Sequence, residues 1–324
     1  MSGNRSGVSS DDIVAAYRMF LGRQPSAHEV SLWHGTHSLD DLRAAFLSSG
    51  EFIANQTRLS ANKAVVDQKS IPSERLTRNL PAAEIEWKTD AATAARLVEH
   101  IRKTWTALGT NRPHWSVLSS DQFLPERIAQ SESIFFASGA DDLATLRSAL
   151  LRHGVATNLP VFEYGCGIGR VTAHLAGVFP RVTACDISTS HLEMAQQVVG
   201  KREGVTFRLV DDDCFGMTER FGIWFSYLVL QHNPPPIIAM ILSRMFKMLA
   251  PGGIALFQVP TYCLNYRFRV AEYLNGGATD GAIEVHCLPQ AVIFYLAHQA
   301  RCVALEVRED TAMGPPEPAW IFVC

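Results

Sequence analysis

The segment "VFEYGCGIGR", residues 161–170, decides the fold. A short run of mostly apolar residues leads directly into glycines at 165, 167 and 169. Glycine tolerates a left-handed backbone and lets the chain approach a ligand closely. The N-terminus of a following helix adds free N–H groups and the positive end of a dipole. We therefore predict a buried strand that ends in a ligand-binding turn.

The spacing of these glycines bears on the kind of ligand. The nicotinamide fingerprint is G-x-G-x-x-G, but Arg170 stands where that pattern has its last glycine. Glu163 lies just before the turn, where a carboxylate would repel a diphosphate and suit an ammonium or sulfonium group. The pattern favours a cationic nucleoside, and a nicotinamide-dependent oxidoreductase remains the less favoured alternative.

Strand-like and helix-like patterns alternate from about residue 159 to the end. Such alternation predicts an α/β fold, a doubly wound and mostly parallel sheet with helices on both faces. In such sheets ligands bind at the carboxyl ends of the strands. The expected strands cover residues 160–164, 181–186, 205–210, 222–228 and 253–259.

These patterns together resemble the class I S-adenosylmethionine-dependent methyltransferases. The match begins with E-x-G-x-G-x-G at 163–169 and continues with "RVTACDIS", a strand that ends in Asp186. An acid roughly 20 residues beyond the glycine turn is the expected position for a ribose contact. Further matches are "VTFRLVDDD", "FGIWFSYLVLQHNPPP" and "LAPGGIALFQVP", while Gly222 departs from the family's usual Asp. The resemblance implies a Rossmann-like, seven-stranded sheet and S-adenosyl-L-methionine as the cofactor.

The resemblance also implies roles for particular residues. Asp186 would accept the ribose hydroxyls, and Asp211 or Asp212 would contact the adenine amino group. Alternatively, Asp186 is only a helix cap, although Ser188 could cap equally well. Adjacent carboxylates at 211–213 repel one another, so at least one of them is expected to be only solvated. A metal site there is conceivable, but we predict none. The predicted cofactor-binding set is Glu163, Gly165, Cys166, Gly167, Gly169, Asp186, Ile187, Asp211 and Asp212.

Candidate catalytic and acceptor-binding residues lie beyond the later strands. His232, in "LQHNPP", and His286, in "EVHCLP", are candidate general bases, since the pKa of a free imidazole lies near neutrality. Each could instead be a satisfied structural histidine. Tyr262 and Tyr266 follow the fifth strand, and Trp115 lies in an irregular stretch between two helices. These three are candidate walls of the acceptor pocket.

Residues 9–54 carry three short helical patterns, each opened by a Ser or Asp cap, and predict a small helical bundle. We expect Leu42, Phe46 and Leu47 to face inward. Tyr17, "LGR" at 21–23 and the closing "FLSSGEF" resemble a helical domain of unknown function found in bacterial surface, glycan-associated and linker proteins. That resemblance implies a docking role. The alternative is that these residues only form the core of the bundle.

The chain is expected to divide into four parts. Two amphipathic helices, one of them ended by Gly109, lie between the polar stretch 55–80 and the alternating region. The expected parts are a helical docking domain at 1–54, a linker at 55–80, a helical extension or lid at 81–158 and the catalytic domain at 159–324.

Composition limits the alternatives. The net charge of −3 and the absence of a long basic run disfavour nucleic-acid binding. No apolar run is long enough to span a bilayer, and the first residues lack an apolar signal core, so we expect a cytoplasmic protein. Seven cysteines show no C-x-x-C pair, which is typical of small buried residues in a reducing compartment.

The sequence thus predicts a methyltransferase that acts on a hydroxyl or amine acceptor. A sugar of a surface polysaccharide is suggested only by analogy with the usual neighbours of the N-terminal domain. A non-catalytic protein that keeps the cofactor fold as a scaffold is the second alternative.

Overall fold

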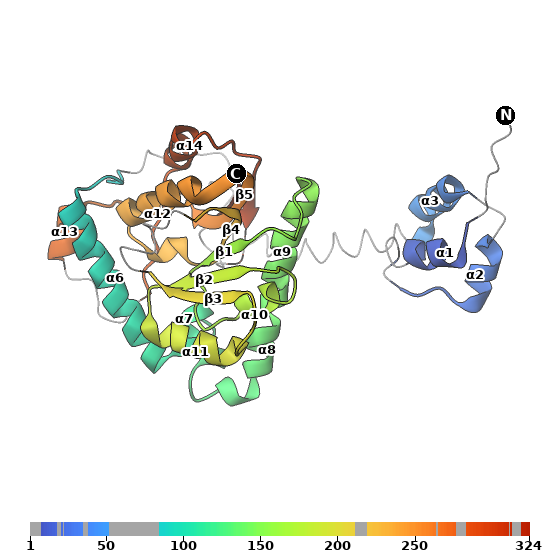
Figure 1. The fold of residues 1–324 in the computed structure, drawn as a ribbon, viewed down its shortest axis with the longest axis horizontal. Helices are drawn as coiled ribbons and strands as arrows, with labels where there is room; N and C mark the ends of the chain where they lie inside the picture. The colour runs from blue at the N-terminus through green and yellow to red at the C-terminus, as the bar shows by residue number, and fades with distance from the viewer. Residues whose placement is uncertain are drawn as a thin grey trace. The chain divides into compact units, whose positions relative to one another are not determined.

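The computed structural model describes residues 8–17, 21, 23–34, 38–51, 84–210, 219–263, 265–276, 283–310, 312 and 319–324. The chain forms two compact units, Met1–Leu80 and Pro81–Cys324 (Figure 1). Each unit is described by itself. The stretch expected to be a linker, 55–80, lies outside the described residues.

Three helices form the described part of the first unit: α1 (Ser10–Ala16), α2 (Ala27–Trp33) and α3 (Leu39–Ser48). Each begins after a serine whose hydroxyl accepts a backbone N–H in the first turn, while an acid three residues on bonds back to the serine N–H. This capping box satisfies two otherwise free N–H groups at each helix start. The capping serines are Ser9, Ser26 and Ser38.

Several residues of the N-terminal motif are explained by the packing of this unit's own core. The ring of Tyr17 packs edge-on against Phe46, with ring centroids 4.8 Å apart. Arg23 lies over the Tyr17 ring and bonds to both Glu29 and Glu51. The motif residues are therefore used within the unit itself.

One expectation for the first unit is wrong. Leu42 and Phe46 are buried, but Leu47 is 43% exposed. Residues four apart share one face of a helix, whereas the next residue is turned about 100° away. Leu47 therefore cannot face the same core as Phe46.

The second unit contains the predicted seven-stranded sheet, in the order β3-β2-β1-β4-β5-β7-β6. The first five strands pair in parallel, and β7 runs antiparallel to both of its neighbours. The strand order reverses at β1, which lies between β2 and β4, and this reversal opens a crevice at the carboxyl ends. The strands are β1 (Val161–Tyr164), β2 (Val182–Asp186), β3 (Val205–Leu209), β4 (Phe221–Ser226), β5 (Leu249–Pro260), β6 (Glu306–Asp310) and β7 (Ala319–Val323).

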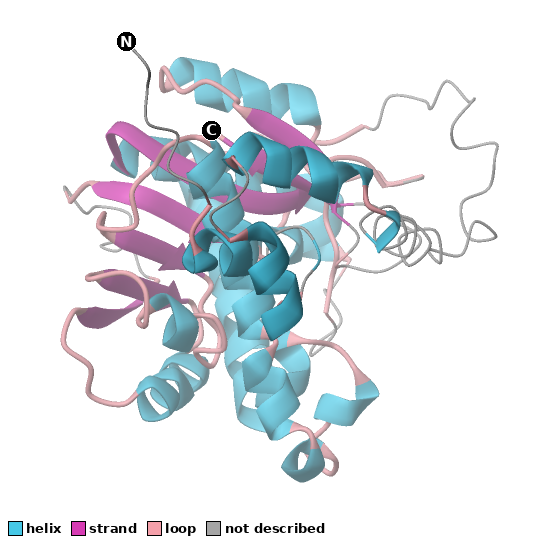
Figure 2. Ribbon diagram, turned by 90° about the vertical axis from the view of Figure 1, so that its right-hand side faces the viewer, coloured by secondary structure: helices cyan, strands magenta, loops and turns pink. Residues whose placement is uncertain are grey.

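Helices cover both faces of this sheet (Figure 2). Alternate strand residues point to opposite faces, so Phe162 and Trp224 pack with α6, α12 and α14, whereas Val161 and Ile223 pack with α9 and α10. The helices are α6 (Ala91–Asn111), α7 (Pro113–Val117), α8 (Glu132–Ala137), α9 (Gly139–Arg152), α10 (Thr172–Leu175), α11 (Thr189–Val199), α12 (Pro235–Met248), α13 (Val270–Asn275) and α14 (Gln290–Gln299), with short 3₁₀ turns at Asp121–Phe123, Ile128–Gln130 and Leu230–His232.

Gly109 does not end its helix, contrary to the expectation. Helix α6 continues to Asn111. A Cβ atom on Gly109 would lie 2.5 Å from the Ser190 hydroxyl and 2.9 Å from Nδ1 of His191. The glycine therefore allows α6 to pack closely on α11, the helix that follows β2.

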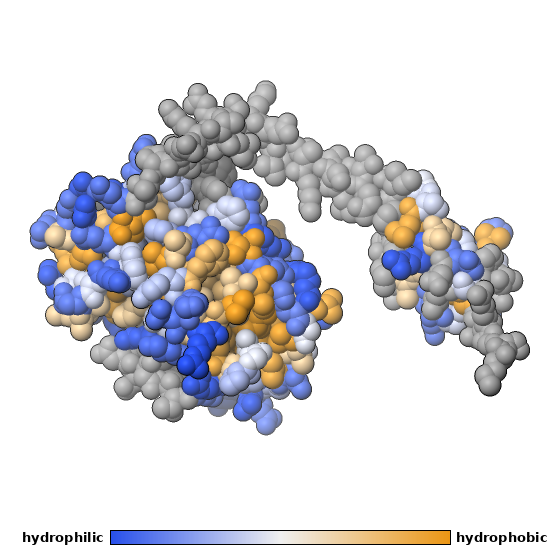
Figure 3. Space-filling model, turned by 90° about the horizontal axis from the view of Figure 1, so that it is seen from above, coloured by the Kyte–Doolittle hydropathy of each residue, from blue (hydrophilic) through white to orange (hydrophobic). Residues whose placement is uncertain are grey.

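In Figure 3, hydrophobic residues gather across part of the larger unit and hydrophilic residues surround them. Leu151 and Val303 are among the exposed large apolar side chains. Within the described ranges, no helix has both the length and the apolar character that crossing a bilayer requires.

Candidate functional site

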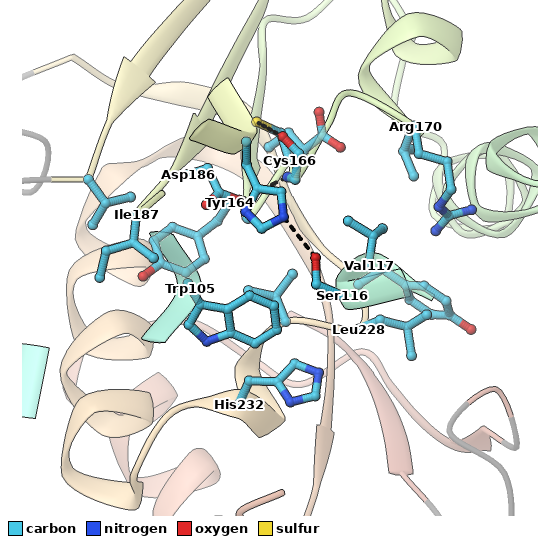
Figure 4. Close-up of a pocket in the computed structure, with 18 of the residues that line it drawn as sticks. Trp105, Ser116, Val117, Tyr164, Cys166, Arg170, Asp186, Ile187, Leu228 and His232 are labelled. Carbon is cyan, nitrogen blue, oxygen red and sulfur yellow. Dashed lines mark hydrogen bonds between the residues drawn. The ribbon is translucent and has the colours of Figure 1, made fainter. Parts of the chain in front are cut away.

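A pocket of about 820 Å³, counted out to the solvent, lies at the carboxyl ends of β1, β2 and β4. The turn after β1 and Asp186 at the end of β2 form its floor, while the segment at 227–229 after β4 lines one wall. Trp105 of α6 and Val117 of α7 also line it (Figure 4). The helical segment expected to be a lid therefore contributes directly to this pocket.

All three glycines of the turn have left-handed φ angles, but Gly169, at 84°, faces Ala195 of α11 and is not among the described residues that line the pocket. Gly165 and Gly167 have φ angles of 77° and 53°. A Cβ atom on Gly165 would lie 2.4 Å from the side chain of Val229, and one on Gly167 would lie 2.8 Å from Val117. Both glycines are thus required by the backbone angle and by the close approach of a pocket wall.

Asp186 faces this turn from the neighbouring strand. Its Oδ2 accepts a hydrogen bond from the N–H of Gly167 at 2.8 Å, and its Oδ1 accepts one from the N–H of Ser188 at 2.9 Å. Each carboxylate oxygen has a further lone pair for a ligand hydroxyl. Ser188, not Asp186, is the N-cap of α11. The alternative role of Asp186 as the cap of this helix is therefore wrong.

Glu163 brings a second carboxyl group to the pocket. It is 3% exposed and accepts a hydrogen bond from the Thr172 hydroxyl at 2.7 Å. Burial raises the pKa of Glu163 to about 7, because the charged form loses its hydration. A cationic ligand would favour the charged carboxylate. The thiol of Cys166 also lines the pocket, and burial raises its pKa well above the ordinary value.

A hydrogen bond joins two residues that line the pocket. Nε2 of His191 lies 2.9 Å from the hydroxyl of Ser116 (Figure 4). The Ser116 hydroxyl donates to the carbonyl of Pro113, so its oxygen is left to accept from Nε2–H of His191. This bond joins α7 to α11. No local sequence pattern marks either residue as part of a site.

Arg170 closes one end of the pocket (Figure 4). It is 5% exposed, forms an ion pair with Asp142 of α9, and donates to the Ser138 hydroxyl at 3.1 Å. The residue that breaks the nicotinamide pattern therefore ties the glycine turn to α9. Burial raises the pKa of Asp142, although the guanidinium opposes that shift.

His232 lines the pocket and has a defined tautomer. Its Nδ1 lies 2.9 Å from the carbonyl oxygen of Glu284. A carbonyl can only accept, so Nδ1 carries the proton and Nε2 of the neutral ring has a free lone pair. Burial lowers the pKa of His232 to about 4, which keeps the ring uncharged near neutral pH.

His286 is not among the described residues that line the pocket. Its Nδ1 lies 2.7 Å from the hydroxyl of Tyr266, and its Nε2 lies 3.1 Å from the carboxylate of Glu284. Glu284 thus contacts His232 through its carbonyl and His286 through its side chain. The structure does not bring His286 or Tyr266 to the pocket, and their proposed roles stay predictions.

The remaining predicted residues take varied positions. The ring of Trp115 packs under the guanidinium of Arg112, while its neighbours at 116–117 line the pocket. Tyr262 is half-buried just beyond β5. Asp211 and Asp212 lie outside the described residues. Across the part of the chain that is described, no group of three His, Cys, Asp or Glu is placed to hold a metal ion.

The chemistry of this pocket fits a positively charged nucleoside. Bare backbone at Gly165 and Gly167 allows close approach, and Asp186 offers acceptor lone pairs to paired hydroxyls. Glu163 offers a carboxyl group poised to lose its proton near a cation. Ile187 adds an apolar contact at the opposite end from Arg170 (Figure 4).

Comparison with known proteins agrees with this chemistry. Residues 161–253 match the family described as "Methyltransferase domain". The chain is 31% identical over 100 residues to a trans-aconitate 2-methyltransferase of Deinococcus radiodurans, a match that covers 31% of this chain and 37% of that protein. It is 33% identical over 116 residues to an N-demethylindolmycin N-methyltransferase of Streptomyces griseus, over 34% and 48% of the two chains. The chain thus spans less than half the length of these relatives.

Among solved structures, a magnesium protoporphyrin IX methyltransferase from Synechocystis, crystallised with bound S-adenosylhomocysteine, aligns with 69% of this chain and 96% of its own. The identity is 17% and the TM-score 0.49.

Residues 161–253 are a methyltransferase domain of the class that uses S-adenosylmethionine. The predictions of fold, enzyme class and cofactor are confirmed for this domain. The relatives methylate different acceptors, and the acceptor of this chain is a separate question.

Proposed function

We propose that the whole chain transfers a methyl group from S-adenosylmethionine to a hydroxyl or amine acceptor held beside His232. The observation that carries this proposal is that one pocket contains the bare Gly165–Gly167 turn, two carboxyl groups and an imidazole with a free nitrogen. The cofactor, when bound, supplies an activated methyl group.

The chain's own part is to hold the two reactants. Asp186 would accept hydrogen bonds from the ribose hydroxyls, and Glu163 would face the positive charge of the cofactor. The backbone of Gly165 and Gly167 would line the ligand site next to Val229 and Val117, with Ile187 against the base. Fixed orientation of two reactants can supply several kcal/mol, about 7 or more in favourable systems, toward the barrier.

His232 would act on the acceptor. Its Nε2 can accept a proton from a hydroxyl, because Nδ1–H is already held by the Glu284 carbonyl. An amine acceptor would instead need a dry site that keeps it uncharged. One relative is named as an N-methyltransferase, and another, from Bacillus cereus, is named as a malonyl-[acyl-carrier protein] O-methyltransferase. The proposal therefore includes both kinds of acceptor.

The first unit supports a narrower proposal. Its resemblance to helical domains of surface and glycan-associated proteins suggests docking and a sugar hydroxyl as one candidate acceptor. The contacts of Tyr17 and Arg23 within the unit explain their presence without a partner. This narrower proposal rests on the resemblance.

The test is transfer of labelled methyl from S-adenosylmethionine by the purified full chain to an extract of small molecules and glycans. We expect labelled product with the wild type and with His298→Gln, whose imidazole is exposed on α14, but much less with His232→Gln. Binding of S-adenosylhomocysteine without any transfer would support the scaffold alternative. Binding of NADH in its place would support an oxidoreductase.

A further inference from the structure

The acceptor side of the pocket is mostly apolar around His232. The ring of Trp105 lies 5.1 Å from the imidazole, centroid to centroid, with the two planes at 51°. Leu228 and Val229 line the same pocket from the segment after β4, and Val117 lines it from α7 (Figure 4). A ligand beside Nε2 of His232 would therefore meet an aromatic face and aliphatic side chains.

This wall is held in place by an unusual backbone. Leu228 has a φ of 60°, a left-handed angle that is rare for a branched residue. Its N–H donates to Oε1 of Gln258 at 3.1 Å, and Gln258 is fully buried in β5. Strained residues that the surroundings hold fixed are often found at binding sites. Gln258 thus positions Leu228 as part of the pocket wall.

Most polar side chains near this wall already have partners. The hydroxyl of Tyr227 donates to Asp310 at 2.8 Å, and Asp310 also accepts from Gln258. Nδ2 of Asn233 donates to the carbonyl of Val229, and Arg170 is paired with Asp142. A sugar would bring several hydroxyls to this wall, and each one buried without a partner costs about 1–3 kcal/mol. An acceptor with a single polar group fits better.

The low basicity of His232 also favours an acceptor with one acidic hydroxyl over a sugar. The pKa of His232 is lowered to about 4, so its imidazole is a weak proton acceptor. Proton transfer to a weak base is easier from a phenol, with a pKa of about 10, than from a far less acidic alkyl hydroxyl. A carboxylate acceptor is disfavoured, because it would need no base and the uncharged His232 would offer it no positive charge to pair with.

Resting on the proposed function, we propose that the acceptor is a flat aromatic or heteroaromatic hydroxyl compound that packs on Trp105 with its O–H directed at Nε2 of His232. The phenolic oxygen forms the bond to the methyl carbon, and the electron pair of the broken sulfur–carbon bond stays on sulfur. The phenolic proton moves to Nε2 of His232 and then to solvent. Atoms and charge balance, because the positive sulfonium becomes a neutral thioether as the proton is released.

The test uses four probes with the purified full chain and labelled S-adenosylmethionine: 2-naphthol, decahydro-2-naphthol, 2-naphthoic acid and a methyl glucoside. The first three share a fused two-ring framework and differ in flatness or in acidity. We expect methylation of 2-naphthol to be at least tenfold faster than that of the others, roughly the discrimination that one pocket contact gives. Calorimetry with S-adenosylhomocysteine is run on the same samples.

Substitutions at two positions, His232 and Trp105, sharpen the result. His232→Gln should lower methylation of 2-naphthol about 100-fold while leaving the dissociation constant of S-adenosylhomocysteine unchanged. Trp105→Leu should weaken binding of 2-naphthol to the protein loaded with S-adenosylhomocysteine, and Trp105→Phe should restore most of it. His298→Gln should match the wild type.

The outcomes separate the two proposals. Equal or faster methylation of the decahydronaphthol, the naphthoic acid or the glucoside would overturn the inference of an aromatic hydroxyl. So would the absence of 2-naphthol methylation by protein that binds S-adenosylhomocysteine. Failure to bind S-adenosylhomocysteine at all would instead overturn the proposed function.

Discussion

The carboxylate of Asp186 accepts a hydrogen bond from the backbone N–H of Gly167 over 2.8 Å. This bond connects the end of β2 to the glycine turn that follows β1. One acidic side chain therefore holds the turn in shape and also faces the space that a ligand would enter. Sequence spacing placed the two residues near each other, and the structure supplies the bond between them.

Asp186→Asn tests the role of this charge in cofactor binding. The amide keeps the size of the side chain but removes the charge that strengthens hydrogen bonds from hydroxyl groups. We expect the affinity for S-adenosylhomocysteine to fall by about 2 kcal/mol, or roughly thirtyfold, in calorimetry. Asp121→Asn, at an exposed position in a 3₁₀ turn, is the matched control. An unchanged dissociation constant for Asp186→Asn would remove that residue from the site.

Glu163 should make cofactor binding depend on pH. Its pKa of about 7 means that the carboxyl is mostly neutral below that pH and mostly charged above it. A cationic cofactor favours the charged form, so affinity for S-adenosylmethionine should rise between about pH 6 and 8, with proton release on binding. Calorimetry in buffers of different ionisation enthalpy measures that release. Glu163→Gln should abolish it, and proton release that persists in this variant would contradict the assignment.

The same carboxyl should affect the stability of the ligand-free protein in the opposite direction. Its folded-state pKa lies above the ordinary value of 4.5, so its favourable contribution is complete below about pH 4.5 and is lost as pH rises through about 7. At pH 8, Glu163→Gln should therefore unfold at a higher temperature than the wild type. Thermal unfolding at several pH values checks this, and a difference that does not grow with pH would count against it.

Gly165→Ala separates steric contact from backbone strain. Gly165 and Gly252 have φ angles of 77° and 75°, but only Gly165 has a neighbour, Val229, within contact distance of an added Cβ. Both alanine variants bear the cost of a left-handed residue. Gly165→Ala should lose a further 1–3 kcal/mol or so to overpacking, measured by urea unfolding. The double variant Gly165→Ala, Val229→Ala should recover part of that loss, and equal stability of the two single variants would refute the contact.

Arg170 is buried and Asp142 is partly buried, so the effects of substituting the two residues on stability should be strongly coupled. Removing only the guanidinium in Arg170→Met leaves a partly buried carboxylate without its partner, at a cost of about 3 kcal/mol in the free energy of unfolding. Replacing both residues, with Arg170→Met and Asp142→Leu, should recover much of that loss. If the double variant were as unstable as the sum of the single variants, the two residues would not act as a pair.

The parts of the fold that depend on local pattern could be predicted. The apolar run before Gly165 and the acid at Asp186 gave the first two strands and their carboxyl ends, because strand period and turn chemistry are local properties. The end of α6 could not be predicted in this way. Gly109 is typical of a helix stop, but here it is selected by contact with Ser190 and His191, residues far along the chain.

The same distinction between local patterns and distant contacts applies to the residues of the site. Trp105 has the helical spacing of a core residue, and nothing local shows that its ring contacts both His191 and His232 at the pocket. His286 resembles His232 in sequence context, since each precedes a helix. The difference arises at Glu284, whose carbonyl holds the ring of His232 at the pocket, while its carboxylate holds the ring of His286 away from it.

The most direct test of the central claim is a calorimetric titration of the full chain with S-adenosylhomocysteine, with NADH titrated in parallel. The bare turn at Gly165–Gly167 with Asp186 and Glu163 predicts saturable binding of one S-adenosylhomocysteine per chain and no binding of NADH. Saturable binding of NADH, or no heat with S-adenosylhomocysteine, would contradict the account.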